Sequence, residues 1–395
     1  MEKIKDKRFF YVGVGIGAVV VVCLVVVAVA ILFQVPISIQ DIETTKVSSQ
    51  IIRISWSDQY DNQVSEYEVK RRNVDANDDA WEVVTVLPSD KSVEGELLYI
   101  EDVLEQNLPQ QYIYRVDMKS SRVLGGKTEP GKEILASNVL ICIDPGHFTG
   151  RNLVEGELSY GYAEGDFVFE VAKELRDILK EKYGIDVYMT RNSEHINLQG
   201  YSDGVLDGWH ISLRGKRAAY RDSDLFVSLH TNANIENAHG NPTCLQPISM
   251  NKPLILVNQI GCDDPTTIAV GNAVGVNLAK ANYALGIASV EEFITVEPGG
   301  VEAWVGKKND ALGTTGTVYY RLNKDGADYY GVLRGAGLVD KPGIIIEHGF
   351  HTVPEMRKEA MEGNLKSIWA NIDAYGIAYG FGFESKMEMT DVLGE

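Results

Sequence analysis

Three apolar segments of this chain each run into a residue that can bind a metal ion or transfer a proton. These residues are His147, His230 and Glu347, and a fourth candidate, Glu164, directly precedes an amphipathic segment. Two imidazoles and one carboxylate are a frequent catalytic zinc set, which leaves a fourth position open for water. His147, Glu164 and His230 can therefore be the ligands of one zinc ion.

Such a site needs a second carboxylate to carry a proton. Zinc lowers the pKa of its water toward ~7 and polarises a substrate carbonyl. A base then takes the water proton and passes it to the leaving nitrogen, and Glu347 can fill that role. Glu155 and Glu157 compete with Glu164 as ligand, and Asp144 either orients a ligand or only forms the Asp-Pro-Gly turn.

The pattern of the chain around these residues predicts an α/β domain. Strands and helices alternate in the order expected for a mainly parallel sheet flanked by helices, with right-handed crossovers. Because the carboxyl ends of parallel strands share one edge of the sheet, the candidate residues should meet there. The expected strands are 139–143, 185–191, 225–229 and 343–346, and the expected helices are 166–183, closed by Gly184, and 212–220, capped by Ser212.

Six short motifs within this domain occur in a fixed order. They are Ile143-Asp144-Pro145-Gly146-His147, Glu164-Gly165-Asp166, Met189-Thr190-Arg191, Ser212-Leu213-Arg214, the run 225–234 and Ile346-Glu347-His348-Gly349-Phe350. The set resembles that of the zinc-dependent N-acetylmuramoyl-L-alanine amidases, which cut bacterial peptidoglycan, over about residues 139–380.

The resemblance implies a role for each site residue. It makes His147, Glu164 and His230 zinc ligands and Glu347 the catalytic residue. The bond cut would be the amide between the lactyl group of N-acetylmuramic acid and L-alanine. We accordingly expect a catalytic domain over about 137–384 and a C-terminal tail over 385–395.

Two features depart from the family pattern. The span from His230 to Glu347 is long, which suggests an insertion within about 236–335. Cys244 and Cys262 lie in it, and either a disulfide or two free thiols fits the sequence. Phe350-His351-Thr352 also replaces the more usual small residue and asparagine, so that His348 and His351 either touch substrate or are packed.

Residues 38–131 change to a period of two. Short alternating strands separated by turn-forming clusters are typical of an antiparallel β-sandwich. The stretch resembles a fibronectin type III domain through Trp56, Tyr67 and Tyr112, with Tyr112 as the tyrosine-corner residue. It contains no catalytic constellation, so we expect a spacer.

The first residues of the chain have the pattern of a membrane anchor. A basic tail, 1–8, precedes an apolar run from Val12 to Phe33, within the predicted span 9–34. Twenty-two helical residues reach about 33 Å, enough for a hydrocarbon core of about 30 Å. The basic flank predicts a single-pass protein of the bacterial cell membrane with its catalytic domain outside. Secretion after cleavage near Ala28-Val29-Ala30 is the alternative.

Charge limits the partners of the chain. Its 395 residues carry a net charge of −19, which argues against nucleic acid because phosphate binding needs a basic face. The expected substrate is peptidoglycan, and the sequence identifies no protein partner. Two other functions stay open: a zinc peptidase that cuts within the stem peptide, and an inactive wall-binding protein.

Overall fold

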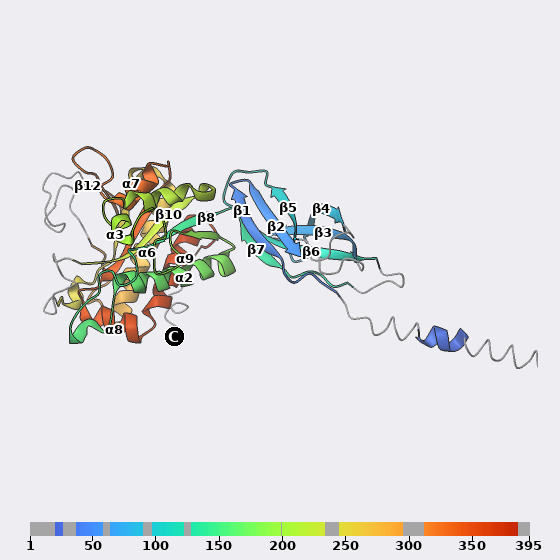
Figure 1. The fold of residues 1–395 in the computed structure, drawn as a ribbon, viewed down its shortest axis with the longest axis horizontal. Helices are drawn as coiled ribbons and strands as arrows, with labels where there is room; N and C mark the ends of the chain where they lie inside the picture. Colours follow the sequence, from blue (N-terminus) through green and yellow to red (C-terminus); the bar gives the residue numbers. More distant parts are fainter. Residues whose placement is uncertain are drawn as a thin grey trace, which may run out of the picture. The chain divides into compact units, whose positions relative to one another are not determined.

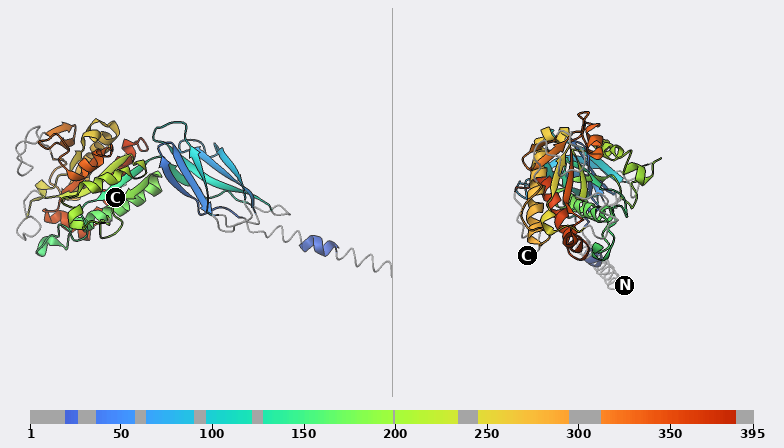
Figure 2. Two further views of the ribbon diagram at one scale, coloured as in Figure 1. Left: turned by 45° about the horizontal axis from the view of Figure 1, so that its top comes forward. Right: turned by 90° about the vertical axis from the view of Figure 1, so that its left-hand side faces the viewer.

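The computed structural model describes residues 20–26, 37–57, 64–89, 97–121, 128–198, 200–233, 245–294 and 312–385 (Figure 1). The chain separates into two compact units (Figure 2). One contains Arg53–Asp102 and Tyr112–Ile134 together with residues up to Thr44. The other contains Leu135–Glu395 together with Thr45–Ile52 and Val103–Gln111.

The first unit consists mainly of β-strands in two sheets, in which β3 is antiparallel to both β4 and β6. Their strand orders are β1-β2-β5 and β4-β3-β6-β7. Alternate side chains are buried, and the rings of Trp56 and Tyr67 lie 5.6 Å apart. The strands are β1 (Glu43–Ser48), β2 (Ile51–Ser57), β3 (Val64–Asn73), β4 (Glu82–Pro88), β5 (Leu97–Val103), β6 (Gln111–Ser120) and β7 (Ile134–Ser137).

Tyr114 is the buried tyrosine of strand β6. Its hydroxyl donates to Asp102 Oδ2 at 2.7 Å, whereas Tyr112, the residue predicted for a tyrosine corner, is only half-buried. Tyr112 and Tyr114 are two positions apart and point to the same face of the strand, so alternation alone does not distinguish them. The likeness to fibronectin type III stays a prediction.

The second unit is a seven-stranded mixed sheet covered by helices. The strand order is β12-β13-β11-β14-β10-β8-β9, in which β14, β10, β8 and β9 are parallel neighbours and β11 is antiparallel to β14. The strands are β8 (Leu140–Pro145), β9 (Asp186–Met189), β10 (Leu225–Asn232), β11 (Leu254–Val257), β12 (Leu312–Thr315), β13 (Val318–Arg321) and β14 (Gly343–Phe350).

Helices cover both faces of this sheet. Side chains at alternate strand positions, such as Ile141 and Ile143, pack against helices α2, α6 and α9. The opposite positions, such as Cys142, pack against α7 and η3. The helices are α2 (Glu164–Tyr183), α3 (Asp203–Leu206), α4 (Ser212–Gly215), α5 (Gln259–Asp263), α6 (Pro265–Ala284), α7 (Gly331–Gly337), α8 (Pro354–Glu362) and α9 (Leu365–Gly380), with 3-10 turns η2 (Glu157–Ser159), η3 (Lys216–Asp222) and η4 (Ile248–Met250).

Several boundaries differ from those predicted. Strand β9 ends at Met189, two residues before the predicted end. The helix expected over 212–220 is α4 followed by the 3-10 turn η3, and Tyr220, with a ψ of 124°, is already extended. Ser212 lies inside α4 rather than capping it. Helix α2 does end where predicted, since Gly184, at a φ of 62°, donates its backbone N–H to Leu179 and Lys180.

The stretch predicted as an insertion, 236–335, belongs largely to the sheet and its cover. It supplies β11, β12 and β13 and the 20-residue helix α6. Cys142 is buried and Cys262 is partly buried, both as free thiols, with Cys262 Sγ 3.6 Å from Thr315 Oγ1. Cys244 lies outside the described residues, so its pairing is untested.

No helix among the described residues is long and apolar enough to cross a membrane. Of the predicted anchor, 9–34, the structure describes only the helical residues 20–26. The rest of that prediction lies outside the described residues.

Candidate metal centre and active site

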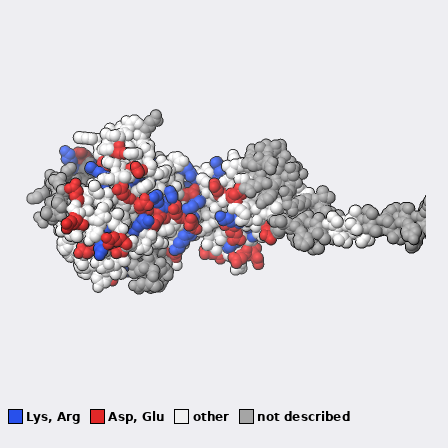
Figure 3. All heavy atoms as spheres, turned by 60° about the horizontal axis from the view of Figure 1, so that its bottom comes forward, with Lys and Arg blue, Asp and Glu red and all other residues white. Residues whose placement is uncertain are grey.

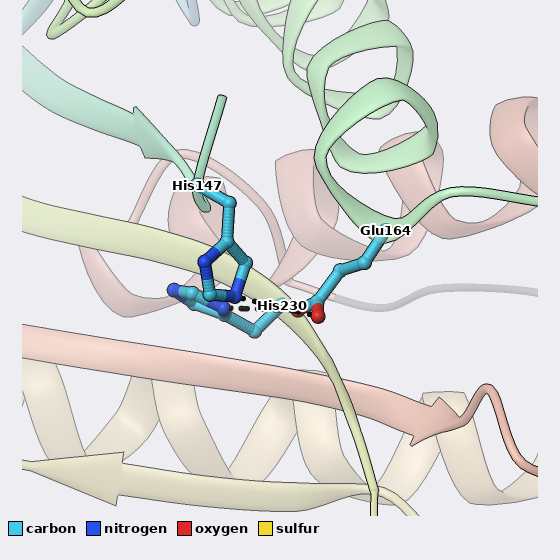
Figure 4. A group of neighbouring side chains, drawn as sticks. All are labelled: His147, Glu164 and His230. Atoms are coloured by element: carbon cyan, nitrogen blue, oxygen red, sulfur yellow. Dashed lines mark hydrogen bonds and ion pairs between the residues drawn. The ribbon is translucent and has the colours of Figure 1, made fainter. Parts of the chain in front are cut away.

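Three neighbouring parallel strands bring the candidate residues to one edge of the sheet. In the register of β10 with β14, His230 stands opposite Glu347, and Leu229 of β10 stands opposite Pro145 of β8. Glu164 is the first residue of α2. Figure 4 shows His147 descending from the chain after β8 and Glu164 reaching in from the start of the helix toward His230.

His147 follows a turn that admits no larger residue than glycine. A Cβ on Gly146 would lie 2.5 Å from His230 Cε1 and from the Leu229 carbonyl oxygen. The backbone of His147 has a φ of 61°, in the left-handed region that a non-glycine residue seldom adopts. The Asp-Pro-Gly turn thus lets β8 approach β10 closely and directs His147 toward His230.

The Glu164 carboxylate lies between the two histidines. Its Oε1 is 3.0 Å from His230 Nδ1 and its Oε2 is 3.3 Å from His147 Nε2. The three ligating atoms lie within 4.8 Å of one another, so one metal ion could contact all of them. The backbone N–H of Thr231 donates to Oε1 at 2.9 Å, and Asn152 Nδ2 donates to Oε2 at 2.7 Å.

Electrostatics keep this carboxylate ionised. Burial raises the pKa of Glu164, but His147 and His230 outweigh that effect and hold it well below its usual range. Burial likewise lowers the pKa of His147, yet Glu164 and Asp207 raise it to about 10. In the metal-free site a protonated His147 therefore pairs with the ionised Glu164, and a bound cation would take the place of that proton.

Glu347 is in a different environment. Its Oε2 is buried and has no hydrogen-bond partner among the described residues. Burial is the main cause that raises the pKa of Glu347, to about 7, and Glu164 raises it further while His230 and His147 lower it. A carboxyl group with a pKa near neutrality can both accept and release a proton in a catalytic cycle.

The other residues predicted as ligands or substrate contacts lie outside the cluster of His147, Glu164 and His230. Glu155 and Glu157 are exposed and outside the cluster. His348 is buried, 2.8 Å from Asp373 Oδ2, and stacks on Trp369. His351 is also buried, with its Nδ1 3.0 Å from Thr231 Oγ1. Both histidines are packed side chains.

Asp144 does not contact a ligand, contrary to one of the two predicted roles. It accepts hydrogen bonds from Arg214, Thr190 and Ser228, and it lies under the turn. The carboxylate beside His147 is Asp207, whose Oδ2 lies 2.8 Å from His147 Nδ1. Sequence reasoning missed Asp207 and Asn152, because both come from polar loops without periodicity.

Comparison with known proteins now adds to this geometry. Residues 141–280 match the Amidase_3 family, N-acetylmuramoyl-L-alanine amidase. This segment contains His147, Glu164 and His230. A curated relative, N-acetylmuramoyl-L-alanine amidase AmiC of Escherichia coli, is 32% identical over 106 residues, which are 27% of this chain and 22% of that protein. The chain thus spans about a fifth of the relative's length.

Two amidases are among the solved structures that match part of this chain. AmiC2 of Nostoc punctiforme is 20% identical over 62% of this chain and 96% of that chain, with a TM-score of 0.37. CwlD of Clostridioides difficile, solved in complex with the GerS lipoprotein, is 13% identical over 65% of this chain and 99% of that chain, with a TM-score of 0.39.

Proposed function

We propose that the chain is a zinc-dependent N-acetylmuramoyl-L-alanine amidase that hydrolyses the amide bond between N-acetylmuramic acid and L-alanine in peptidoglycan. The observation that carries the proposal is the Glu164 carboxylate between His147 and His230, within the segment that matches the amidase family. Glu347 stands opposite His230 on the neighbouring strand.

The donor set suits zinc. Two imidazole nitrogens and one carboxylate oxygen are borderline ligands of the kind that catalytic zinc sites use with an open position. The ionised Glu164 supplies the negative charge, and the buried Oε2 of Glu347 lacks a partner among the described residues. A zinc ion held there would polarise the substrate carbonyl and make water a stronger acid.

The residues of the chain would have separate roles in this reaction. His147, Glu164 and His230 hold the metal, while Asn152 and the Thr231 backbone fix the Glu164 carboxylate. Glu347 takes the proton of the attacking water on its carboxylate and donates it to the amide nitrogen, which leaves as the amino group of L-alanine. Burial raises the pKa of Glu347, which favours uptake of the proton from water.

Product analysis tests this function against its alternatives. Purified peptidoglycan digested by the full chain should yield glycan strands with free muramic lactyl carboxyls and intact stem peptides that begin with L-alanine. A chelator should stop the reaction and added zinc should restore it. Cleavage within the stem peptide would favour the zinc peptidase instead, and binding without any product would favour the inactive wall-binding protein.

We propose in addition that residues 9–34 anchor the protein in the bacterial membrane with the catalytic unit outside. The uninterrupted apolar run after a basic tail supports this. The β-strand unit would serve as a fibronectin-like spacer, which its lack of a metal-ligand cluster among the described residues supports.

A further inference from the structure

The two nitrogens of the His147 ring face different partners. Nε2 lies 3.3 Å from Glu164 Oε2 and 3.2 Å from Asn152 Nδ2, so it faces the metal position. Nδ1 lies 2.8 Å and 3.0 Å from the two oxygens of Asp207. A histidine whose Nδ1–H donates to a carboxylate presents the lone pair of Nε2 to a metal, because the tautomer and the ring angle are both fixed.

Asp207 is itself held rigidly. Its side chain is only 3% exposed, although it belongs to the polar loop after α3. Arg214 Nη1 donates to its Oδ1 at 2.9 Å, and Arg151 Nε lies 3.4 Å from its Oδ2. The position of Asp207 therefore depends on an arginine inside the protein rather than on the loop alone.

Arg214 connects Asp207 to the core of the sheet. Its Nε and Nη2 donate to the two oxygens of Asp144 at 3.0 and 2.8 Å, and its side chain is 1% exposed. Asp144 also accepts hydrogen bonds from the hydroxyl groups of Thr190 and Ser228. A guanidinium that is hydrogen-bonded along two edges has one orientation. Arg214 therefore holds the carboxylate of Asp207 in a fixed position relative to Asp144.

His147 needs such support more than an ordinary residue. Its backbone has a φ of 61°, outside any helix or strand, and that conformation alone does not direct the ring. His230, in contrast, lies on a paired strand. Of the described contacts, Asp207 is what directs the ring of His147 from the side opposite Glu164.

We propose that Asp207 is the positioning residue of His147: it fixes the tautomer and angle of the ring so that Nε2 faces the metal, and Arg214 and Asp144 hold it in place. This role rests on the zinc site of the proposed function. Asp207 is not a ligand, since it contacts the nitrogen that faces away from Glu164. It acts on the reaction through His147 alone.

Metal affinity in variants of the full chain tests this role. We expect Asp207→Ala to lower zinc affinity about 10- to 100-fold, the usual effect of removing the partner of a metal-bound histidine. Asp207→Asn should lose less, because its Oδ1 still accepts from Nδ1. Zinc affinity is measured by competition with a chromophoric chelator. The visible spectrum of the cobalt(II) form reports the ligand geometry independently of activity.

Asp203→Asn is the matched control. Asp203 is a carboxylate four positions earlier in the same segment, and it pairs with His195 Nδ1 at 2.6 Å instead of with a ligand. This variant should keep wild-type zinc affinity. Thermal unfolding of the zinc-free proteins shows which variants fold, and Asp207→Asn serves where Asp207→Ala does not.

The outcomes separate the two proposals. Wild-type affinity and an unchanged cobalt spectrum in the Asp207 variants would overturn the positioning role while the zinc site stands. An equal loss in Asp203→Asn would also overturn it, because the effect would then belong to the loop as a whole. Wild-type protein that takes up no zinc would overturn the metal site and this role with it.

Discussion

Glu164 and Glu347 are two carboxylates of one site with opposite electrostatics. Burial raises the pKa of both, but Glu164 has two histidine partners that reverse the shift, whereas in Glu347 burial dominates. Under the proposed function, these environments suit Glu164 to holding a cation and Glu347 to exchanging a proton.

Amide variants of the two residues should separate these roles. Glu347→Gln keeps the shape of the side chain and removes the base, so zinc content should be nearly unchanged and the rate should fall roughly 10²- to 10⁴-fold. Glu164→Gln removes an anionic ligand and should weaken zinc binding. Elemental analysis and single-turnover rates on a soluble muropeptide measure both. Zinc loss in Glu347→Gln with retention in Glu164→Gln would mean that the two assignments are reversed.

The raised pKa of Glu347 also makes a prediction for zinc-free protein. The folded state binds this proton more tightly than the unfolded chain, with a pKa of about 7 against 4.5. The contribution of Glu347 to stability is thus fully present below pH 4.5 and is lost as the pH rises through 7. The free energy involved is roughly 3 kcal/mol, from about 1.4 kcal/mol per pKa unit.

Glu347→Gln does not titrate and lacks this loss. Relative to wild type, its free energy of unfolding should therefore rise between pH 5 and pH 8. Urea unfolding of both proteins in excess chelator checks this, and the other titrating groups cancel to first order in the difference. A difference that does not change with pH would show that Glu347 titrates normally.

The sequence predicted the candidate site residues better than the residues that hold them in place. His147, Glu164 and His230 stand at apolar boundaries that periodicity makes visible, and the structure brings all three together. Asp207 is one of several acidic residues in the stretch 194–207, and no pattern distinguishes it. Its role follows only from the fold, which turns it toward Nδ1 of His147.

At the scale of elements, strands β10 and β14 run through the site instead of stopping at it. The sequence predicted ends at His230 and Glu347 because the apolar run stops there, but the strands continue to Asn232 and Phe350, with an irregular register after His230. Polar residues at a strand end interrupt periodicity without interrupting backbone pairing. Strand β11, only four residues long, was missed within the predicted insertion.

Close approach of β8 and β10 depends on Gly146. A Cβ at this position would collide with His230 and with the backbone of Leu229, so Gly146→Ala must move the turn or the ring. We expect a loss of about 1–3 kcal/mol in unfolding free energy, typical of overpacking, together with weaker zinc binding.

Gly204→Ala is the control for this substitution. Gly204 lies in α3 with open space at its Cβ position. Alanine there should leave the unfolding free energy and the zinc affinity at or above their wild-type values. Denaturant unfolding and chelator competition measure them. Normal zinc affinity in Gly146→Ala would show that the turn tolerates a side chain and does not determine the distance between His147 and His230.

At the scale of the whole molecule, charge and the apolar segment give opposite expectations for membranes. The net charge is −19, and on the face in Figure 3 acidic and basic side chains are interspersed. Apart from its short basic tail, such a protein gains little from anionic lipid headgroups. We therefore expect membrane association to depend mainly on the apolar run between Val12 and Phe33.

Cell fractionation tests the role of this apolar run. The full chain should sediment with bacterial membranes. High salt should not release it, because the apolar run and not ionic attraction holds it there. Detergent should bring it into solution. A chain that begins at Ile37 lacks the apolar run and should stay in the soluble fraction without added salt, at high salt and with detergent. Val22→Arg places a charge near the middle of the run, at a cost of about 2.5–3.5 kcal/mol, and should weaken membrane retention. Sequencing the N-terminus of the exported protein separates the two modes of export, because a new terminus just after Ala30 would mean that the segment is a cleaved signal and that the enzyme is released.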